Sequence, residues 1–304
     1  MIYEVTYRAL SPLHIGYRQM GILKTTRYYI TGKALWGAIT ANLTRHLLDA
    51  PGPNKYKEVG DEYRKVGDTV KTAIRATYFF PLVDGNIYFP HYARCGSEKE
   101  ELKYGGLTES QFERTFIYSR VSTALDRTRT ADENTLHETE YIKNKIVVGN
   151  KIRDVLWRGY LFVREENSEV KAIEENDFVV EKEGKALHAS NFLQRLEVGG
   201  ERNYGFGRLL LIEKMKKATE VFGSRTTGCT IRSDTAFGHV HYKDVDYTGE
   251  IEPLVGRIWS EKGPGRKTID NHQQERQFIF FVPGTNFRSK INLEIADCGT
   301  WKTT

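Results

Sequence analysis

The spacing of apolar and polar side chains predicts strands and helices along the first two thirds of the chain. Residues 2–9 alternate between the two kinds of side chain, which predicts a half-buried strand. From Lys33 the apolar residues recur at helical spacing, and Thr31 stands where its hydroxyl can cap the start of that helix. Residues 77–92 have the pattern of a β-hairpin, and an apolar run at 160–163 predicts a further strand.

Three other segments lack a clear apolar face. Residues 51–72 are polar, which predicts a loop and a short helix. Residues 95–112 have the composition of a surface insertion. Residues 165–183 carry eight acidic residues against two lysines. This last surface is unsuited to nucleic acid, because its charge would repel phosphate.

The chain changes character after Glu213. Residues 214–228 are basic and then rich in Gly, Ser and Thr, which is typical of a linker. Residues 229–304 hold many turn signals and short strand patterns, notably at 276–283 and 290–296. We therefore expect an α+β fold with a smaller β-rich C-terminal region.

A glycine-rich stretch lies near the end of the first part. Four glycines fall within residues 199–207, after a helical pattern that Ser190 could begin and Gly199 could end, and before an apolar strand at 209–212. The predicted order is helix, loop, strand, which excludes a dinucleotide-binding turn. A P-loop is excluded because Phe206 stands where its lysine must be. Bare backbone and neighbouring arginines could accept phosphate, and a tight connection is the alternative interpretation.

The N-terminal segment from Val5 to Leu48 contains no Asp or Glu. In a chain with 28% charged residues, such a run indicates a surface of one sign. Loops of this kind ahead of a helix N-terminus attract phosphate, although a merely solvated basic face would show the same pattern. Its basic residues are Arg8, Arg18, Lys24, Arg27, Lys33 and Arg45.

Composition limits the remaining classes of protein. The 304 residues are 39% hydrophobic with a net charge of +5, which is typical of a globular chain with a real core. The three cysteines, Cys95, Cys229 and Cys298, are scattered, which fits a reducing cytoplasm and speaks against a thiolate zinc site. We see neither a signal peptide nor a membrane-spanning run, so we expect a cytoplasmic protein without a membrane partner.

Three motifs in order carry a family resemblance. They are the sequences at 11–16 with 29–39, at 124–131 with 136–140, and at 199–209, namely SPLHIG with YITGKALWGAI, ALDRTRTA with LHETE, and GGERNYGFGRL. Together they resemble the RAMP superfamily of CRISPR-associated proteins, and most of all the backbone-type subunits of type III effector complexes. The resemblance covers about residues 1–213.

This resemblance implies a ferredoxin-like (RRM-like) βαββαβ core with insertions over residues 1–213, including a thumb-like insertion at about 114–141. Residues 214–228 would be the linker, and 229–304 the β-rich C-terminal region. Family members assemble side by side along a CRISPR RNA, whose backbone the first loop and the glycine loop touch. The implied partners are CRISPR RNA, other CRISPR effector subunits and, in addition, target RNA.

The expected RNA-binding residues come from the three motif regions. In the N-terminal region they are His14, Gly16, Arg18, Lys24, Arg27, Lys33 and Trp36. In the thumb they are Arg120, Arg127 and Arg129. In the glycine loop they are Gly200, Arg202, Asn203, Tyr204, Gly205, Gly207 and Arg208. For Trp36, as for Tyr28, stacking on a base and packing in the core are both open.

Two other kinds of site were weighed. His239 and His241 alternate along a strand pattern and, with Asp244 or His272, could bind zinc; structural histidines are the favoured interpretation, so we expect no metal and no cofactor. His14 could act as an acid or base in RNA cleavage.

The favoured function is that of a non-catalytic CRISPR RNA-binding subunit of a class 1, type III-like effector complex in antiviral defence. The alternative is a RAMP-family metal-independent endoribonuclease that processes CRISPR RNA. Relatives that cut target RNA use an aspartate in the loop after the His-Ile-Gly motif, and residues 16–30 here contain no acid. Asp126 is the nearest motif acid, and Arg127 beside it suits a structural ion pair. We therefore expect binding without cleavage.

Overall fold

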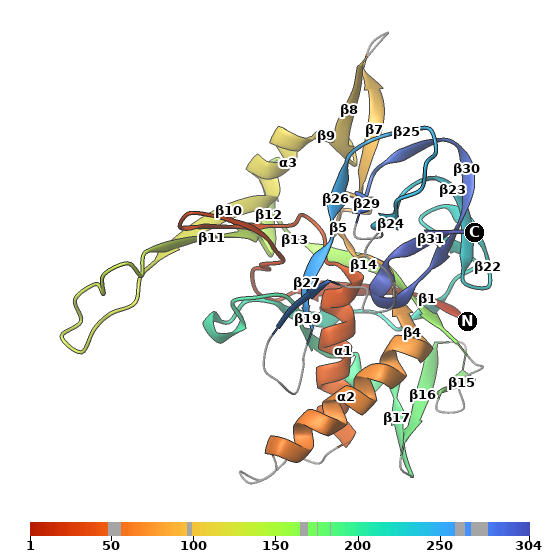
Figure 1. Cartoon of the computed structure of the whole chain (residues 1–304), viewed down its shortest axis with the longest axis horizontal. Coiled ribbons are helices and arrows are strands. Elements are labelled where there is room, and N and C mark those ends of the chain that lie inside the picture. Colours follow the sequence, from red (N-terminus) through yellow and green to blue (C-terminus); the bar gives the residue numbers. More distant parts are fainter. Residues whose placement is uncertain are drawn as a thin grey trace.

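The chain has a mixed α+β fold in which strands predominate and helices are few. The computed structural model describes residues 1–47, 56–95, 99–164, 170–174, 176–182, 184–258, 265–268 and 279–304. Two β-sheets share a core, two helices lie together below the central sheet, and a long hairpin extends from the body (Figure 1). Within the described residues, no helix is both long and apolar enough to span a membrane.

An eight-stranded antiparallel sheet forms the centre. Its order is β18 (Arg195–Glu197), β19 (Arg208–Leu211), β1 (Ile2–Ala9), β14 (Leu156–Val163), β5 (Phe80–Val83) and β6 (Asn86–Ile87). In addition, β20 (Lys216–Lys217) pairs with β1, and β4 (Ile74–Ala76) pairs with β14. The strand predicted at residues 2–9 is confirmed, but the prediction that it is half-buried was wrong. Both of its faces are covered, because Tyr3, Val5 and Tyr7 face the main core while Ile2 faces the C-terminal sheet.

Two helices cover one face of the central sheet. The first, α1 (Gly32–Leu47), buries Leu35, Ile39 and Leu43, and the Thr31 hydroxyl accepts the Ala34 N–H at 3.3 Å, as the sequence predicted. The second, α2 (Tyr56–Ala73), has 18 residues. The prediction of a loop and a short helix at 51–72 was wrong from residue 56 onward, because a narrow apolar stripe is enough to seat this polar helix on α1. That stripe is Val66, Val70 and Ala73.

The segment expected to be a surface insertion contributes to the core. It forms β7 (Pro90–Cys95), β8 (Lys99–Tyr104), β9 (Leu107–Thr108) and α3 (Glu109–Phe116). Thr108 and Gln111 cap α3 reciprocally, in a capping box. On the inner face of α3, the rings of Phe112 and Phe116 stack at 4.5 Å and are fully buried. The helix therefore anchors the hairpin that follows it.

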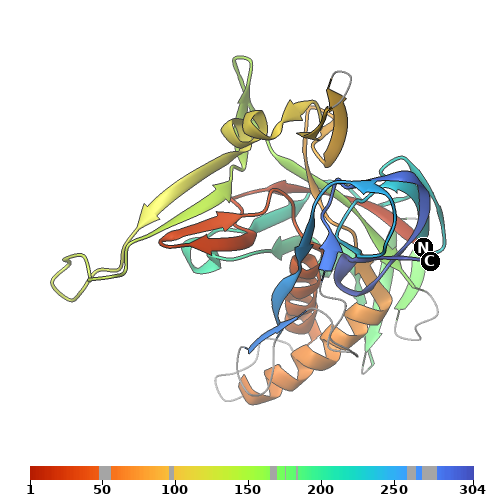
Figure 2. The same ribbon diagram turned by 45° about the horizontal axis from the view of Figure 1, so that its top comes forward.

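A four-stranded sheet extends away from the body. Its order is β10 (Ile117–Ser122), β11 (His137–Ile142), β3 (Leu23–Thr26) and β2 (Gly16–Met20). We call the β10–β11 hairpin with its tip, residues 117–142, the thumb hairpin. Figure 2 shows it running beside the shorter β2–β3 hairpin, with the loop that precedes β19 next to both. A further hairpin follows it, made of β12 (Lys145–Val148) and β13 (Lys151–Asp154).

The C-terminal part forms a nine-stranded sheet. Its strands are β21 (Glu220–Val221), β22 (Ser224–Thr227), β23 (Thr230–Thr235), β24 (Val240–His241), β25 (Tyr247–Thr248), β26 (Ile251–Pro253), β29 (Ile279–Phe281), β30 (Asn286–Ile295) and β31 (Trp301–Thr303). Strand β29 is the described part of the predicted strand at 276–283. Smaller elements are β15 (Val170–Glu174), β16 (Asp177–Lys182), β17 (Lys185–His188), α4 (Ala189–Phe192), β27 (Val255–Ile258), β28 (Gly265–Thr268), and the 3₁₀ turns η1 (Arg202–Tyr204) and η2 (Asp297–Gly299).

The segment that joins the two sheets contributes strands to both of them. Residues 214–228, whose composition is that of a linker, contain β20 in the central sheet and β21 and β22 in the C-terminal sheet. Met215 and Val221 in this segment are buried. Phe162 of β14 meets Trp301 edge-on at 6.1 Å, which places apolar side chains of both sheets in one cluster.

Candidate nucleic-acid interface

The glycine-rich stretch is the loop of a β-hairpin. The helix predicted to run through Leu196 was wrong, because α4 ends at Phe192 and β18 begins at Arg195. Leu196 is buried between two exposed neighbours, so the local period is that of a strand. The observed order is strand, loop, strand, with Leu196 opposite Leu209. This order still excludes a dinucleotide-binding turn.

Two of the loop glycines are required by close packing. Gly199 has φ +79°, and a Cβ there would lie 2.3 Å from the His14 carbonyl oxygen. Gly207 has φ +86°, and its Cβ would lie 2.1 Å from the Val198 carbonyl oxygen. The N–H groups of Gly200 and Gly207 donate to His14 and Pro12 carbonyl oxygens at 2.8 Å. These two N–H groups are therefore not available to a phosphate.

His14 joins the first loop, residues 10–15 between β1 and β2, to the thumb hairpin. Its Nδ1 lies 2.7 Å from the carbonyl oxygen of Glu140, and because a carbonyl only accepts, Nδ1 carries the hydrogen. The side chain is 6% exposed, and its other nitrogen faces the side of Gly16 and Gly200. His14 thus connects three segments that are far apart in the sequence, and its ring is shielded from solvent.

Two further contacts fix these segments. The Glu140 carboxylate accepts the Thr26 N–H at 3.1 Å, which joins β11 to β3. Lys24 Nζ lies 2.9 Å from Glu201 Oε1, which joins β3 to the glycine loop. Glu201 has φ +55°, the left-handed conformation. The position of Glu201 between a glycine and an arginine in the sequence did not predict its pairing with Lys24. Because of this pairing, the charge of Lys24 is already balanced within the protein.

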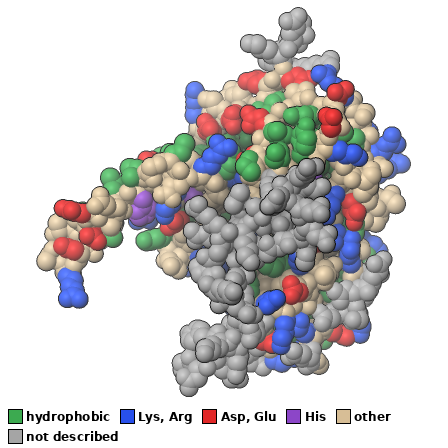
Figure 3. Space-filling view, in the orientation of Figure 1, with side chains coloured by type: hydrophobic (Ala, Val, Ile, Leu, Met, Phe, Trp, Pro, Cys, Tyr) green, Lys and Arg blue, Asp and Glu red, His purple; other side chains and the backbone are tan. Residues whose placement is uncertain are grey.

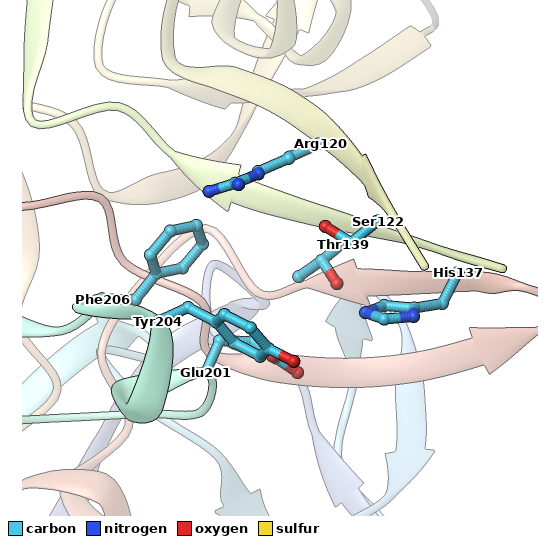
Figure 4. A pocket seen from close by; sticks show the side chains of 7 residues that line it. All are labelled: Arg120, Ser122, His137, Thr139, Glu201, Tyr204 and Phe206. Atoms are coloured by element: carbon cyan, nitrogen blue, oxygen red, sulfur yellow. The ribbon is translucent and has the colours of Figure 1, made fainter. Parts of the chain in front are cut away.

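A small pocket lies where the thumb hairpin faces the glycine loop (Figure 4). Its volume of about 20 Å³ is enough for one water molecule and too small for a base. The lining residues are Arg120, Ser122, His137 and Thr139 from the hairpin, and Glu201, Tyr204 and Phe206 from the loop. Phe206 packs edge-on against Tyr141 at 5.4 Å, whereas the Tyr204 side chain is 65% exposed beside the opening. The pocket itself therefore cannot hold a base, and Tyr204 is the exposed ring among its lining residues.

Most of the predicted arginines are exposed. Arg18 lies over the Tyr17 ring at 4.6 Å, and Arg120, Arg202 and Arg208 belong to the elements that meet at His14. Asn203 and Tyr204 are exposed on η1, and Gly205 ends it with φ +84° and open space around its Cβ position. Gly16 opens the exposed strand β2.

Arg127 and Arg129 lie apart from that group, in the tip of the thumb hairpin (Figure 1). Asp126 organises this tip by accepting hydrogen bonds from Thr128 and from the Thr130 N–H at 2.7–2.9 Å. These bonds lower the pKa of Asp126, that from the Thr128 hydroxyl most and that from the Thr130 N–H next. The expected ion pair with Arg127 is not formed among the described residues, and Asp126 instead holds its own loop together.

Arg27 does not belong to the exposed group. Its guanidinium lies 2.7 Å from Glu252 Oε1 and donates to the Tyr29 hydroxyl at 3.0 Å, with only 11% of the side chain exposed. The same Glu252 oxygen contacts His239 Nε2 at 2.6 Å, and the Tyr78 hydroxyl contacts His239 Nδ1 at 2.7 Å. The prediction that Arg27 grips RNA is therefore corrected: Arg27 holds the segment after β3 to the C-terminal sheet.

Lys33 and Trp36 are likewise directed inward. Lys33 Nζ is buried, makes no hydrogen bond among the described residues, and has a pKa lowered by burial. The Trp36 indole N–H donates to the Gly67 carbonyl at 2.9 Å, and the ring packs on α2. Tyr28 packs against Tyr104 and Phe112. For Trp36 and Tyr28, the structure selects core packing over base stacking.

The histidines weighed as metal ligands have other contacts. Burial lowers the pKa of His239 to about 4, so the ring is neutral and donates to Glu252. The His241 ring packs on Phe280 at 4.4 Å, and His272 lies outside the described residues. In the part of the chain that the structure describes, no group of three or more His, Cys, Asp or Glu side chains could hold a metal ion.

Sequence comparison now decides the family. The RAMP superfamily profile matches residues 6–210, two thirds of the chain and all three motif regions. The chain belongs to the RAMP superfamily. No curated protein matches the sequence.

One solved structure has a similar fold over most of the chain. A chain of the type III-B Cmr-beta complex bound to cognate target RNA and AMPPnP superposes with a TM-score of 0.52 and 11% identity, over 94% of this RAMP protein and 86% of that chain. Oligomeric Cmr4 from Pyrococcus furiosus gives a TM-score of 0.30 and 15% identity, over 72% of this protein and 100% of Cmr4. At 11% identity the first likeness concerns the fold alone, and the TM-score of the second is too low to support an argument.

Proposed function

We propose that this RAMP protein binds a CRISPR RNA as a non-catalytic subunit of a class 1, type III-like CRISPR effector complex in antiviral defence. One observation carries the proposal. The first loop, the thumb hairpin and the glycine loop meet at His14, which accepts the Gly200 N–H through its carbonyl and donates to Glu140 through its ring. Three motif regions of a RAMP protein thereby form one surface with exposed arginines.

The strand order supports a ferredoxin-like (RRM-like) core within residues 1–213. Strands β19, β1, β14 and β5 are consecutive in the sheet and antiparallel, and in chain order they are the fourth, first, third and second of a βαββαβ unit. Helix α1 follows the first of these strands, and α4 precedes the β18–β19 hairpin. The thumb-like insertion lies between β5 and β14, and residues 229–304 would form an addition to this core.

The RNA backbone would cross the junction of the three segments. Arg18, Arg120, Arg202 and Arg208 supply exposed guanidinium groups, which bind phosphate oxygens through paired N–H donors. The exposed Tyr204 ring beside the small pocket offers a surface on which one base can stack. Phosphate contacts give affinity without reading sequence, so a subunit of this kind would accept any guide.

Two features support binding without cleavage. Residues 16–30 supply no carboxylate to hold the divalent ion that activates a nucleophile, and Asp126 is held by its own loop. The alternative, a metal-independent endoribonuclease, would need an accessible His14, and this residue is buried with its Nδ1 already bonded. We propose other effector subunits as further partners, and target RNA as a ligand reached through the bound CRISPR RNA.

Single-stranded RNA that contains the CRISPR repeat tests both the proposed binding and the proposed absence of cleavage. We expect the purified protein to bind the RNA in EDTA and leave it intact. Site-specific cutting in EDTA that disappears in a His14→Ala variant would replace the proposal with the nuclease. Absence of RNA binding at low salt would remove both.

A further inference from the structure

The β2–β3 hairpin and the residue that follows it carry three cations, of which one is available to a ligand. These cations are Arg18, Lys24 and Arg27. Lys24 is paired with the glycine loop, and Arg27 is paired with Glu252. Arg18 makes no ion pair within the described part of the chain, and all residues of its strand β2 are exposed. Arg18 is therefore the cation of this hairpin that an RNA phosphate can reach.

A β-bulge on β2 determines where the Arg18 side chain points. The register shifts between Gly16 and Gln19, where two residues of β2 stand opposite one residue of β3. Adjacent side chains on a regular strand point to opposite faces. Here the Arg18 guanidinium instead lies over the ring of its neighbour Tyr17, at 4.6 Å from the ring centroid. The bulge accounts for this contact, because the extra residue turns the strand and re-aims its side chains.

Thr25 holds the bulge in place from the other strand. It is the residue of β3 that stands opposite the bulge. Its hydroxyl accepts the Arg18 N–H at 3.0 Å and donates to the Arg18 carbonyl oxygen at 3.0 Å. These two bonds replace the backbone partners that a bulge leaves unpaired. Both polar groups of the Arg18 backbone are thus fixed, although the strand is exposed to solvent.

Arg27 fixes the Tyr17 ring from inside the protein. Its guanidinium lies 4.4 Å from the Tyr17 ring centroid, which is the distance of a cation–π contact. The same guanidinium is held by Glu252 of β26 at 2.7 Å and by the Tyr29 hydroxyl at 3.0 Å. The Tyr17 ring therefore lies between the C-terminal sheet and Arg18. Because Glu252 balances the charge of Arg27, this neighbour repels Arg18 less than an unpaired cation would.

The placing of single arginines matters on a surface of mixed charge. On the face shown in Figure 3, the described Lys and Arg side chains are dispersed among Asp and Glu. Such a surface attracts phosphate through individual cations and not through one large basic patch. An arginine that is already held in one position loses less side-chain freedom when it binds. Residues that hold such an arginine therefore contribute to affinity without contacting the ligand.

We infer that Tyr17, Thr25 and Arg27 are positioning residues, which hold the Arg18 guanidinium where it meets an RNA phosphate. The inference rests on the proposed RNA binding and adds a route by which the C-terminal sheet takes part in it. Through Arg27 and Glu252, that sheet sets the position of the Tyr17 ring, and the ring sets the position of Arg18. Arg27 thus acts on RNA binding from the interior.

The experiment is a double-mutant cycle with the full chain and labelled single-stranded RNA that contains the CRISPR repeat, measured by anisotropy. We expect Tyr17→Leu to weaken binding about fivefold, the cost of ordering one long side chain. Tyr17→Phe keeps the ring and should bind nearly as well as the wild type. In an Arg18→Ala background, Tyr17→Leu should have no further effect, since no guanidinium remains to be positioned. The matched control is Tyr242→Leu, an exposed tyrosine of the C-terminal region, which should bind as the wild type does.

A second pair of variants tests the bulge. Thr25→Val keeps the branched shape and removes the hydroxyl, so we expect weaker binding that again depends on Arg18. Thr25→Ser keeps the hydroxyl and should restore the affinity. If the wild type binds RNA and Tyr17→Leu weakens binding by the same factor with and without Arg18, the inference is overturned and the proposed function stands. The inference is also overturned if Tyr17→Phe binds as weakly as Tyr17→Leu. A wild-type protein that binds no RNA at low salt would overturn both.

Discussion

Replacing Glu252 by Gln removes one charge from a buried network and leaves its partner behind. The Glu252 and Arg27 side chains are 7% and 11% exposed and lie 2.7 Å apart, so the Arg27 charge would remain buried with the Tyr29 hydroxyl and an uncharged amide as neighbours. Breaking a buried pair by removing one partner costs about 3–5 kcal/mol. Because glutamine matches glutamate in shape, the loss would report charge and not packing.

The assay is urea unfolding at pH 7, followed by tryptophan fluorescence. The control is Glu220→Gln, whose partner Arg225 lies 4.0 Å away on the surface, and whose loss should cost less than about 1 kcal/mol. Arg27→Met combined with Glu252→Leu should recover part of the stability, because no unpaired charge remains. A loss below about 1 kcal/mol for Glu252→Gln would refute the assignment of Arg27 to the interior and return it to the RNA surface.

Three further outcomes follow from the described contacts. Burial lowers the pKa of His239 from 6.5 to about 4, so between these pH values only the unfolded chain takes up that proton. About 3 kcal/mol of folding stability, present above pH 6.5, should therefore be lost as the pH falls toward 4. Urea titrations of a His239→Gln variant should not show this loss between pH 6.5 and 4. Gly207→Ala should cost at least about 2 kcal/mol because its Cβ meets backbone, whereas Gly205→Ala, in open space, should cost about 1 kcal/mol; similar thermal shifts for both would contradict this. Complementary RNA added with magnesium to the RNA-loaded protein should stay whole, and cuts that vanish in Asp126→Ala would sink the non-catalytic assignment.

The spacing of apolar side chains predicted the strands and helices that are determined by residues within one segment. The strand at 2–9 and the helix after Thr31 follow from periodicity and from the capping residue, whereas the thumb-like insertion was implied by the family resemblance. The membership in the RAMP superfamily followed from three short motifs, which the profile match over residues 6–210 confirms.

The wrong predictions have a common cause: each of these residues contacts residues that are far away in the sequence. Arg27 looked like one more cation of an acid-free surface, but Glu252, 225 positions later, takes it into the interior. Trp36 lies off the apolar face of α1 and is covered by α2, a helix that its polar sequence concealed. Leu196 fitted a helical spacing, and the pairing partner Leu209 that makes it a strand residue could not be identified from that segment alone.

Salt dependence of single-stranded RNA binding tests the central claim most directly. Each phosphate that the protein neutralises contributes about 0.7 to the slope of log K against log salt. Replacing Arg18, Arg120 and Arg202 by Ala should make that slope shallower by about 2, since three contacts are lost. A matched variant replaces three exposed cations of the C-terminal sheet, Arg225, Arg232 and Lys302, and should keep the wild-type slope. An unchanged slope in the first variant, or an equal loss in both, would contradict the proposed RNA surface.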